Sequence, residues 1–404
     1  MFLLHNFIIF WAIFINICQG SERILTYKLN PGCGEICDGK NLTTFYLRAD
    51  GSNDTLHYLW DFIGHPSILL TVTSSTAELN IDWKNYLSHQ PKSINFTETP
   101  LYSFGLLVEK ILEFNDVNDT GSIFNISDNY INVLNSQYFH WIRKNTAENK
   151  RFIELDMIGK NYNDPESNTS RVGDIEIILN GFSTLDHSDV TPHLLHSENS
   201  TQIDFVINHF KTNSSFTKSR FGVELMMISP GDPNSKMFVD TKKSLDDEHT
   251  PGIFEIVEIT TPKITVKNNK ESAYLQWRPV SYSTSDRDVT SSTETILYPL
   301  INSLEIPHNS LLYAFYGNET NSLLIEKMNI TIGTSGDGFY KKTNYTTWTF
   351  IVGYGSPPGE QFSYLVIMII SIGVGLPVIT MILAAIHACI RRLRRRQTTR
   401  LVNS

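Results

Sequence analysis

The sequence predicts an all-β ectodomain built from packed β-sandwiches, followed by one transmembrane helix near the C-terminus. Two observations carry this prediction. Apolar and polar residues alternate along many short segments bounded by Asn, Gly, Pro and Asp, which is the pattern of half-buried strands. A long apolar run, 364–390, has no formal charge and directly precedes a cluster of arginines, as expected of a membrane span.

The chain begins with an apolar run, Phe2–Cys18, that is followed by Gln19, Gly20 and polar residues. Small residues at Cys18 and Gly20 are typical of the region before a cleavage site, so residues 1–20 are predicted to be a signal peptide. An uncleaved anchor is the alternative, because only the amino terminus and His5 supply positive charge to this segment.

Two cysteines, Cys33 and Cys37, lie between the signal segment and the C-terminal apolar run. The secretory route is oxidising, so we expect them to form a disulfide that closes a small Gly-rich loop. A thioredoxin-like pair would have two intervening residues beside a βαβ pattern, and neither condition holds. The ectodomain must then be held together by an ordinary hydrophobic core.

Six segments show the strand pattern most clearly: 151–159, 173–182, 201–210, 221–229, 252–260 and 327–333. Amphipathic helices are few, and the candidates are 82–88 and 138–144. Residues 21–361 are therefore predicted to form the all-β ectodomain. Two sandwich units fit this length as well as one does, and a boundary between them is expected near the polar stretch 184–200.

Eleven Asn-X-Ser/Thr sequons lie between the signal segment and the apolar run. All of them fall on the side of the membrane where N-glycosylation takes place. If most are used, glycans cover much of the ectodomain and hinder proteases. The asparagines are Asn41, Asn53, Asn95, Asn118, Asn125, Asn168, Asn199, Asn213, Asn318, Asn329 and Asn344.

Residues 362–390 are predicted to form the transmembrane helix, because roughly 20 apolar residues span the hydrocarbon core. The tail, 391–404, carries six arginines, and Arg-rich segments stay on the cytoplasmic side. The chain is therefore predicted to be a type I single-pass protein with a luminal ectodomain. Small residues on one helix face would allow close approach of a partner helix: Gly373, Pro377, Thr380, Ala384 and Ala388.

The charge of the ectodomain argues against nucleic acid as a partner. The tail takes six of the 33 Lys and Arg, which leaves 27 against 42 Asp and Glu. Proteins that bind nucleic acid need a positive field to attract the phosphates. The arginine run is therefore interpreted as a topology anchor rather than as a nuclear address.

The search for catalytic chemistry finds no metalloprotease, nucleophile-elbow, phosphate-loop or dinucleotide motif. The Gly-rich stretch 333–338 is predicted to be a turn. The stretch 244–249 gathers Asp246, Asp247 and Glu248, which are interpreted as a solvated or partner-facing loop; a cation site or an acid/base set is the alternative. We expect no catalytic residue, no cofactor and no metal.

Six segments stand out in their order along the chain: DTLHYLW (54–60), ILEFND (111–116), NDP with the sequon NTS (163–170), SLDDEHTPGIFEI (244–256), LQWRPVSYS (275–283) and YAFYG (313–317). In this order they resemble the glycosylated lysosomal membrane protein family. The resemblance runs from about residue 25 to the membrane helix. It implies a non-enzymatic lysosomal protein that serves as accessory subunit of a major-facilitator dipeptide transporter and protects it from luminal proteolysis.

Two features depart from the family pattern. Family members carry several further luminal cysteines downstream, which are missing here, so no disulfide pattern is carried over. Vertebrate members end in a Tyr-based sorting signal, whereas this tail has neither a tyrosine nor a dileucine. Delivery to the lysosome is therefore expected to depend on the partner or on luminal sorting.

The sequence thus leads to the expectation of an accessory subunit in the lysosomal membrane. Its ectodomain would cap the luminal loops of a multi-span transporter, with Asp246, Asp247 and Glu248 as polar contacts, and its helix would pack on the transporter's side. A homodimer through the ectodomain is also open. The alternatives are an adhesion or receptor ectodomain at the cell surface or in endosomes and, less favoured, a membrane-tethered luminal hydrolase.

Overall fold

The computed structural model describes residues 22–124, 126–244, 250, 252–266, 269–318, 320–359 and 364–402, with side chains of the C-terminal helix described for 368–392. The segment 1–20, predicted as a signal peptide, lies outside the described residues. The described residues up to Pro358 form one compact unit, called here the β body. Gly359–Ser404 form a second unit that contains helix α4.

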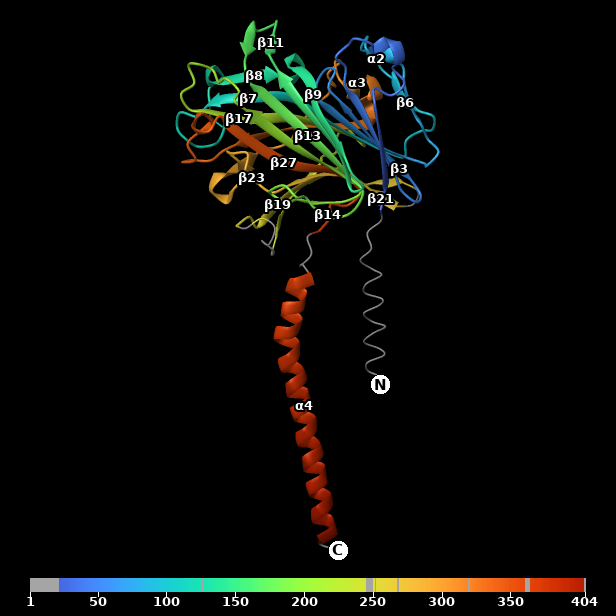
Figure 1. The fold of residues 1–404 in the computed structure, drawn as a ribbon, viewed down its shortest axis with the longest axis vertical. Helices are drawn as coiled ribbons and strands as arrows, with labels where there is room; N and C mark the ends of the chain where they lie inside the picture. Colours follow the sequence, from blue (N-terminus) through green and yellow to red (C-terminus); the bar gives the residue numbers. More distant parts are fainter. Residues whose placement is uncertain are drawn as a thin grey trace. The chain divides into compact units, whose positions relative to one another are not determined.

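The β body consists of two layers of antiparallel strands (Figure 1), which confirms the predicted all-β class. In the first layer the order is β1-β2-β3-β4-β7-β17-β26, with β8 beside β7 and with β24 and β25 beside β26. The bounds are β1 (Ile24–Leu29), β2 (Thr44–Asp50), β3 (Thr55–Asp61), β4 (Ser67–Thr73), β7 (Tyr102–Asn115), β8 (Ile131–Asn135), β17 (Ser219–Pro230), β24 (Ser292–Leu297), β25 (Ile301–Asn302) and β26 (Leu323–Ile332).

In the second layer the order is β9-β10-β13-β16-β27-β22-β19-β18, with β23 also beside β27. Strand β24 pairs with both β23 and β26, so it links the two layers. The bounds are β9 (His140–Glu148), β10 (Phe152–Lys160), β13 (Asp174–Phe182), β16 (Ser200–Asn208), β18 (Phe238–Lys243), β19 (Glu255–Thr260), β22 (Ala273–Trp277), β23 (Val280–Tyr282) and β27 (Tyr345–Tyr354).

Short hairpins and helices complete the β body. The hairpins are β5 (Leu79–Ile81) with β6 (Ile94–Phe96), β11 (Tyr162–Asp164) with β12 (Thr169–Arg171), β14 (Asp186–His187) with β15 (Leu195–His196), and β20 (Ile264–Val266) with β21 (Asn269–Glu271). The helices are α2 (Trp83–Tyr86) and α3 (Leu311–Tyr316), and single 3-10 turns are η1 (Gly34–Cys37), η2 (Asp128–Tyr130), η3 (Ser136–Tyr138), η4 (Val289–Ser291), η5 (Thr320–Ser322) and η6 (Tyr340–Lys342).

The main core lies between the two layers, where alternate residues of each strand face inward. Tyr102 of the first layer and Tyr354 of the second are in ring contact, with centroids 5.4 Å apart. The layers approach so closely at Gly181 that an added Cβ would lie 2.2 Å from Cδ2 of Leu47. Burial of these inner faces is the main stabilising term of the fold.

The outer face of the first layer is also buried, because α2 and α3 pack against it. Trp83 and Leu312 from these helices join Leu59 and Leu69 from the strands in a second cluster. Strands β3 and β4 are therefore buried at every position. A strand covered on both faces loses the apolar and polar alternation that marks a half-exposed strand.

All six strands predicted from the alternation are present. The helix predicted at 82–88 is confirmed as α2, whose first turn is capped by the Asp82 side chain. The helix predicted at 138–144 is wrong, because His140–Glu148 form β9 and pair with β10. Backbone pairing with a neighbouring strand outweighed the local pattern there. Helix α3 was not predicted.

The stretch 184–200 carries the β14–β15 hairpin. The strands on either side of this stretch, β13 and β16, are direct neighbours in the second layer.

Helix α4 (Tyr364–Val402) contains a segment, Met368–Arg392, that is long and apolar enough to cross a membrane. The large apolar side chains described along it are exposed, as lipid-facing residues would be. The helix continues through the arginines that follow the apolar segment.

Candidate functional site

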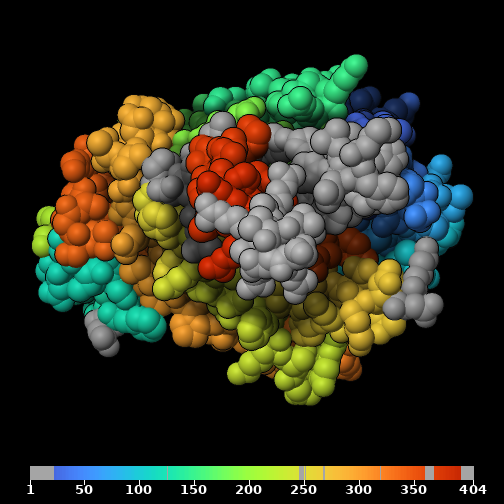
Figure 2. All heavy atoms as spheres, turned by 90° about the horizontal axis from the view of Figure 1, so that it is seen from below, coloured from blue at the N-terminus to red at the C-terminus, as the bar shows by residue number. Residues whose placement is uncertain are grey.

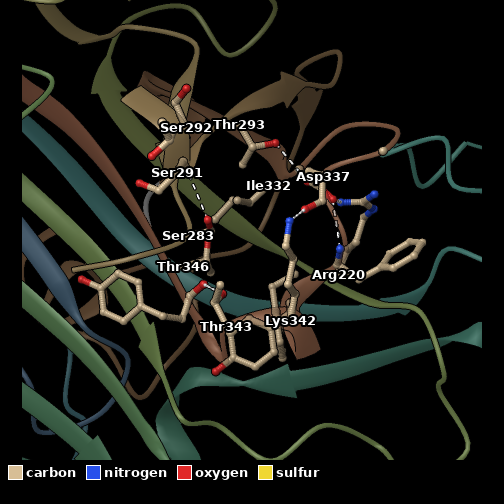
Figure 3. Close-up of a pocket in the computed structure, with 17 residues that line it drawn as sticks. Arg220, Ser283, Ser291, Ser292, Thr293, Ile332, Asp337, Lys342, Thr343 and Thr346 are labelled. Atoms are coloured by element: carbon tan, nitrogen blue, oxygen red, sulfur yellow. Dashed lines mark hydrogen bonds and ion pairs between the residues drawn. The ribbon is translucent and has the colours of Figure 1, made fainter. Parts of the chain in front are cut away.

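A cleft of about 250 Å³ lies beside Arg220 at one end of the β body (Figure 3). Its walls come from the start of β17, from η4 and β24, and from the segment between β26 and β27. The turn 333–338, predicted from its glycines, forms part of this wall. Gly333 and Gly336 take positive φ of 110° and 85°, which glycine adopts without steric cost.

Arg220 is the centre of the charge arrangement next to the cleft, and its side chain is only 2% exposed. Its Nε donates to Asp116 at 2.8 Å, and Nη2 donates to Asp119 at 2.6 Å and to the Thr334 carbonyl at 2.7 Å. Its Nη1 contacts both carboxylate oxygens of Asp337, at 2.6 and 2.7 Å. Phe339 lies against the guanidinium, 4.6 Å from its centre.

This arrangement ties two distant loops together. Asp116 and Asp119 come from the loop between β7 and β8, and Asp337 comes from the loop between β26 and β27. The two loops, teal and orange, lie side by side in Figure 2, and Gly336 N–H donates to Asp119 at 3.0 Å. Every nitrogen of Arg220 has a partner, so the cluster has the character of a structural clamp rather than of a ligand site.

The pKa values of the clamp carboxyls fit this structural role. Burial alone would raise the pKa of Asp337, but hydrogen bonds from Arg220 and from the Phe339 and Thr334 amides outweigh it and hold the pKa below 3.8. The pKa of Asp116 is likewise lowered, because the backbone amides of Thr120 and Gly121 and then Arg220 outweigh its burial. Both carboxyls remain ionised in a moderately acidic compartment.

Three hydroxyl groups of the cleft are engaged with other polar atoms. Ser283 donates to the Ser291 carbonyl at 3.0 Å, and Ser291 donates to the Asp288 carbonyl at 2.8 Å. Thr293 donates to Asp337 at 3.0 Å. The lining residues include no His and no Cys, and the carboxylate next to Thr293, that of Asp337, is also held by Arg220. Across the described ranges, no three His, Cys, Asp or Glu are placed to hold a metal.

Buried titratable groups occur elsewhere in the β body, but they do not converge. Burial lowers the pKa of His57, His65 and His196 to about 4 in each case. Asp61 is fully buried, with its Oδ1 accepting a hydrogen bond from Thr44 at 2.5 Å. Burial raises the pKa of Asp61 to about 6. These groups lie in the protein interior, where they affect the pH dependence of folding.

The predicted sequon asparagines lie on the surface wherever the structure describes them. Asn125 lies outside the described residues. None of the other ten is buried, and three of them are half-buried: Asn199, Asn213 and Asn329. The remaining seven are exposed: Asn41, Asn53, Asn95, Asn118, Asn168, Asn318 and Asn344.

The other predicted site residues are the two cysteines, the three carboxylates at 246–248 and the five small residues of α4. Cys33 and Cys37 form the expected disulfide, and Cys33 packs in the cluster under α2. Asp246, Asp247 and Glu248 lie outside the described residues.

The five small residues of α4 are all exposed along that helix: Gly373, Pro377, Thr380, Ala384 and Ala388.

The clamp around Arg220 was missed by sequence reasoning. Arg220 is more than 100 residues away from each of its carboxylate partners along the chain, so no local pattern connects them. The available signal was an arginine at the start of a strongly apolar strand, since a buried arginine requires anionic partners.

Comparison with known proteins gives one consistent family. Residues 43–395 match the family model described as glycosylated lysosomal membrane protein. Glycosylated lysosomal membrane protein B of Xenopus laevis is 27% identical, over 91% of this chain and 90% of that protein. The relative of the same name from Danio rerio is 28% identical, over 92% and 90%, and that from Homo sapiens 25%, over 82% and 80%.

One solved structure, a copper-containing benzylamine oxidase from Hansenula polymorpha, was compared with this chain. The alignment covers 76% of this chain and 59% of the oxidase chain. The TM-score is 0.20 and the sequence identity 5%. A likeness this low carries no argument about fold or function.

Proposed function

The chain belongs to the glycosylated lysosomal membrane protein family, and on that premise we propose that it is a non-enzymatic accessory subunit of a multi-span lysosomal dipeptide transporter. In this role the β body faces the lumen and shields the transporter's luminal loops from proteases. Helix α4 anchors it beside the transporter, and the arginines keep the tail in the cytoplasm. The family is named for a membrane protein rather than for an enzyme.

The observation that supports shielding is the surface position of the sequon asparagines. All ten that the structure describes are exposed or half-buried, so attached glycans would project from the body without unfolding it. Proteases need an extended, accessible segment of chain, and bulky glycans close to such segments exclude them sterically.

The observation that supports membrane association with a partner is the exposed small-residue face of α4. At 100° per residue, Gly373, Thr380 and Ala384 fall within one narrow sector of the helix. Helices in lipid associate through close van der Waals contact, which small residues permit.

The first test is purification of the full-length glycosylated protein from its own cells in mild detergent, with mass spectrometry of co-purifying proteins. Recovery of a major-facilitator-type transporter supports the accessory-subunit proposal. Recovery of the protein alone, or with extracellular ligands or surface proteins of other cells, contradicts it and favours the receptor alternative.

A second test separates shielding from catalysis of transport. Removal of the accessory protein should lower the abundance of the transporter in lysosomes, while the transport rate of each surviving copy stays unchanged. Loss of rate per copy at constant abundance would contradict the shielding role. Activity of the purified β body against hydrolase substrates between about pH 4 and pH 7 would favour the hydrolase alternative.

A further inference from the structure

The outer face of the second layer carries a group of seven side chains, four of them carboxylates, that we call the acidic face. It comprises Glu154, Asp156, Glu176, Ile178, Asn180, Gln202 and Asp204. The strand register aligns Glu154 with Asn180 and Gln202, and Asp156 with Ile178 and Asp204. Because alternate residues of a strand share a face, all seven side chains stand on the same side of the layer. Strands β9, β13 and β27 of this layer run across the front of the β body in Figure 1.

Negative charge exceeds positive charge on the acidic face. Lys144 lies 3.2 Å from Asp156 and 3.1 Å from Glu176, and Arg287 lies 3.2 Å from Asp204. Glu154 takes part in none of the ion pairs found among the described residues of this face. Four carboxylates are thus matched by two cations.

Two buried oxygen acceptors on this face lack hydrogen-bond partners among the described residues. Oδ1 of Asp156 and Oε1 of Gln202 are unpaired, although the side chains are only 7% and 1% exposed. A buried acceptor without a donor is costly, so a donor supplied by a binding partner would bring a gain. The pKa of Glu154 is raised, first by its burial and then by the nearby Asp156 and Asp204.

Glycans would leave the acidic face bare. None of the ten described sequon asparagines lies within a strand of the second layer. Asn199 and Asn344 directly precede β16 and β27, at opposite ends of these antiparallel neighbours. The first layer and the elements covering it, in contrast, carry Asn95 on β6 and Asn329 on β26. Glu154, Glu176, Ile178 and Asn180 are partly exposed, so this part of the acidic face stays accessible to a protein partner in the glycosylated molecule.

We propose that the acidic face is the docking surface for a luminal segment of the multi-span partner that carries Lys or Arg side chains. This inference rests on the proposed function and names the surface that would perform it. A cationic side chain of the partner would pair with Glu154, which is half-buried, and would lie next to Asp156, whose Oδ1 lacks a donor. Charge-assisted hydrogen bonds of this kind are strong in a partly buried setting.

The test uses full-length protein carrying Glu154→Arg or Glu154→Gln, purified in mild detergent from cells that contain the partner. Glu154→Arg is expected to lower the recovered partner by at least about tenfold, with Glu154→Gln in between. The matched control is Glu78→Arg, an exposed carboxylate next to β5 on the other side of the β body. It should recover as much partner as the unchanged protein.

A second measurement does not depend on the folding of a charge-reversed variant. Ile178, at the centre of the acidic face, is replaced by the photo-cross-linker benzoylphenylalanine, with Glu78 replaced in the same way as control. Illumination should link the partner to position 178 and not to position 78. A link from position 178 to a second copy of this chain would overturn the proposal.

The outcomes separate the two proposals. Recovery of a transporter by the unchanged protein, with equal recovery by Glu154→Arg and no cross-link at position 178, overturns the docking surface and leaves the accessory role standing. Equal losses in Glu154→Arg and Glu78→Arg also overturn it, because they indicate a general charge effect. If the unchanged protein recovers no multi-span protein at all, the accessory role itself fails.

Discussion

Nη1 of Arg220 lies 2.6 Å from Oδ1 and 2.7 Å from Oδ2 of Asp337. This contact joins the first residues of β17 to the turn that follows β26, and Asp116 and Asp119 extend it to a third segment. Because Arg220 is almost fully buried, removing one of its anionic partners leaves buried positive charge less well compensated.

Asp337→Asn is expected to destabilise the β body by about 3 kcal/mol, since breaking a buried ion pair has a cost of this order. Urea unfolding of the variant at neutral pH measures the change. The control is Asp186→Asn, whose partner Arg151 lies 3.8 Å away with both side chains exposed. It should change the free energy of unfolding by less than about 0.5 kcal/mol. Equal effects of the two substitutions would show that the clamp does not stabilise the fold.

Asp61 is expected to make the β body more stable in acid. Its pKa is about 6 in the folded protein, against 3.8 without the burial that raises it. The folded state therefore binds the proton more tightly, and stability from this group falls as pH rises from about 3.8 to about 6. When pH rises from 4 to 7, the free energy of unfolding of Asp61→Asn should increase by about 3 kcal/mol relative to that of the unchanged protein.

Urea unfolding of both proteins at several pH values gives this difference directly. The comparison is needed because His57, His65 and His196 act in the opposite direction. Their lowered pKa values, about 4, mean that stability from these groups is lost as pH falls from about 6.5 to about 4. A difference between Asp61→Asn and the unchanged protein that does not vary with pH would contradict the assignment to Asp61.

Gly181→Ala should disturb the contact between the layers. The new methyl group would lie 2.2 Å from Cδ2 of Leu47, and overpacking of a core costs about 1–3 kcal/mol. Thermal unfolding measures the loss. Gly359→Ala, where no atom lies within 4 Å of the added Cβ, should leave the melting temperature unchanged. An unchanged melting temperature in Gly181→Ala would mean that the layers do not meet closely at this point.

The small-residue face of α4 should matter for recovery of the transporter. Joint replacement of Gly373, Thr380 and Ala384 by leucine blocks close helix approach and is expected to reduce recovery at least about fivefold. The control replaces Ile379, Ile382 and Ile386, on the opposite face, by leucine, which keeps the side-chain volume. For both triple variants, mass spectrometry of the detergent-purified protein measures the amount of co-purified transporter. Full recovery with the first variant would place the contact elsewhere.

The sequence by itself determined the class of the fold and the position of the apolar helix near the C-terminus. Alternation along 151–159 and 173–182 predicts strands because side chains of a strand alternate between core and solvent, and this local rule holds without knowledge of the partner strand. The apolar segment of α4 can also be predicted from the sequence, since its length and composition alone decide whether it can span a membrane. The disulfide between Cys33 and Cys37 followed from the absence of other cysteines in the same segment.

Only the tertiary structure decided which distant residues meet. The segment 138–144 has a helical pattern but pairs with β10, because hydrogen bonds to a neighbouring strand decide the conformation of such a short segment. Arg220 and Asp337 are 117 residues apart, and the acidic face depends on the register of three strands, β10, β13 and β16. Contacts of this kind arise from the packing of whole layers, so no periodicity within a single segment encodes them.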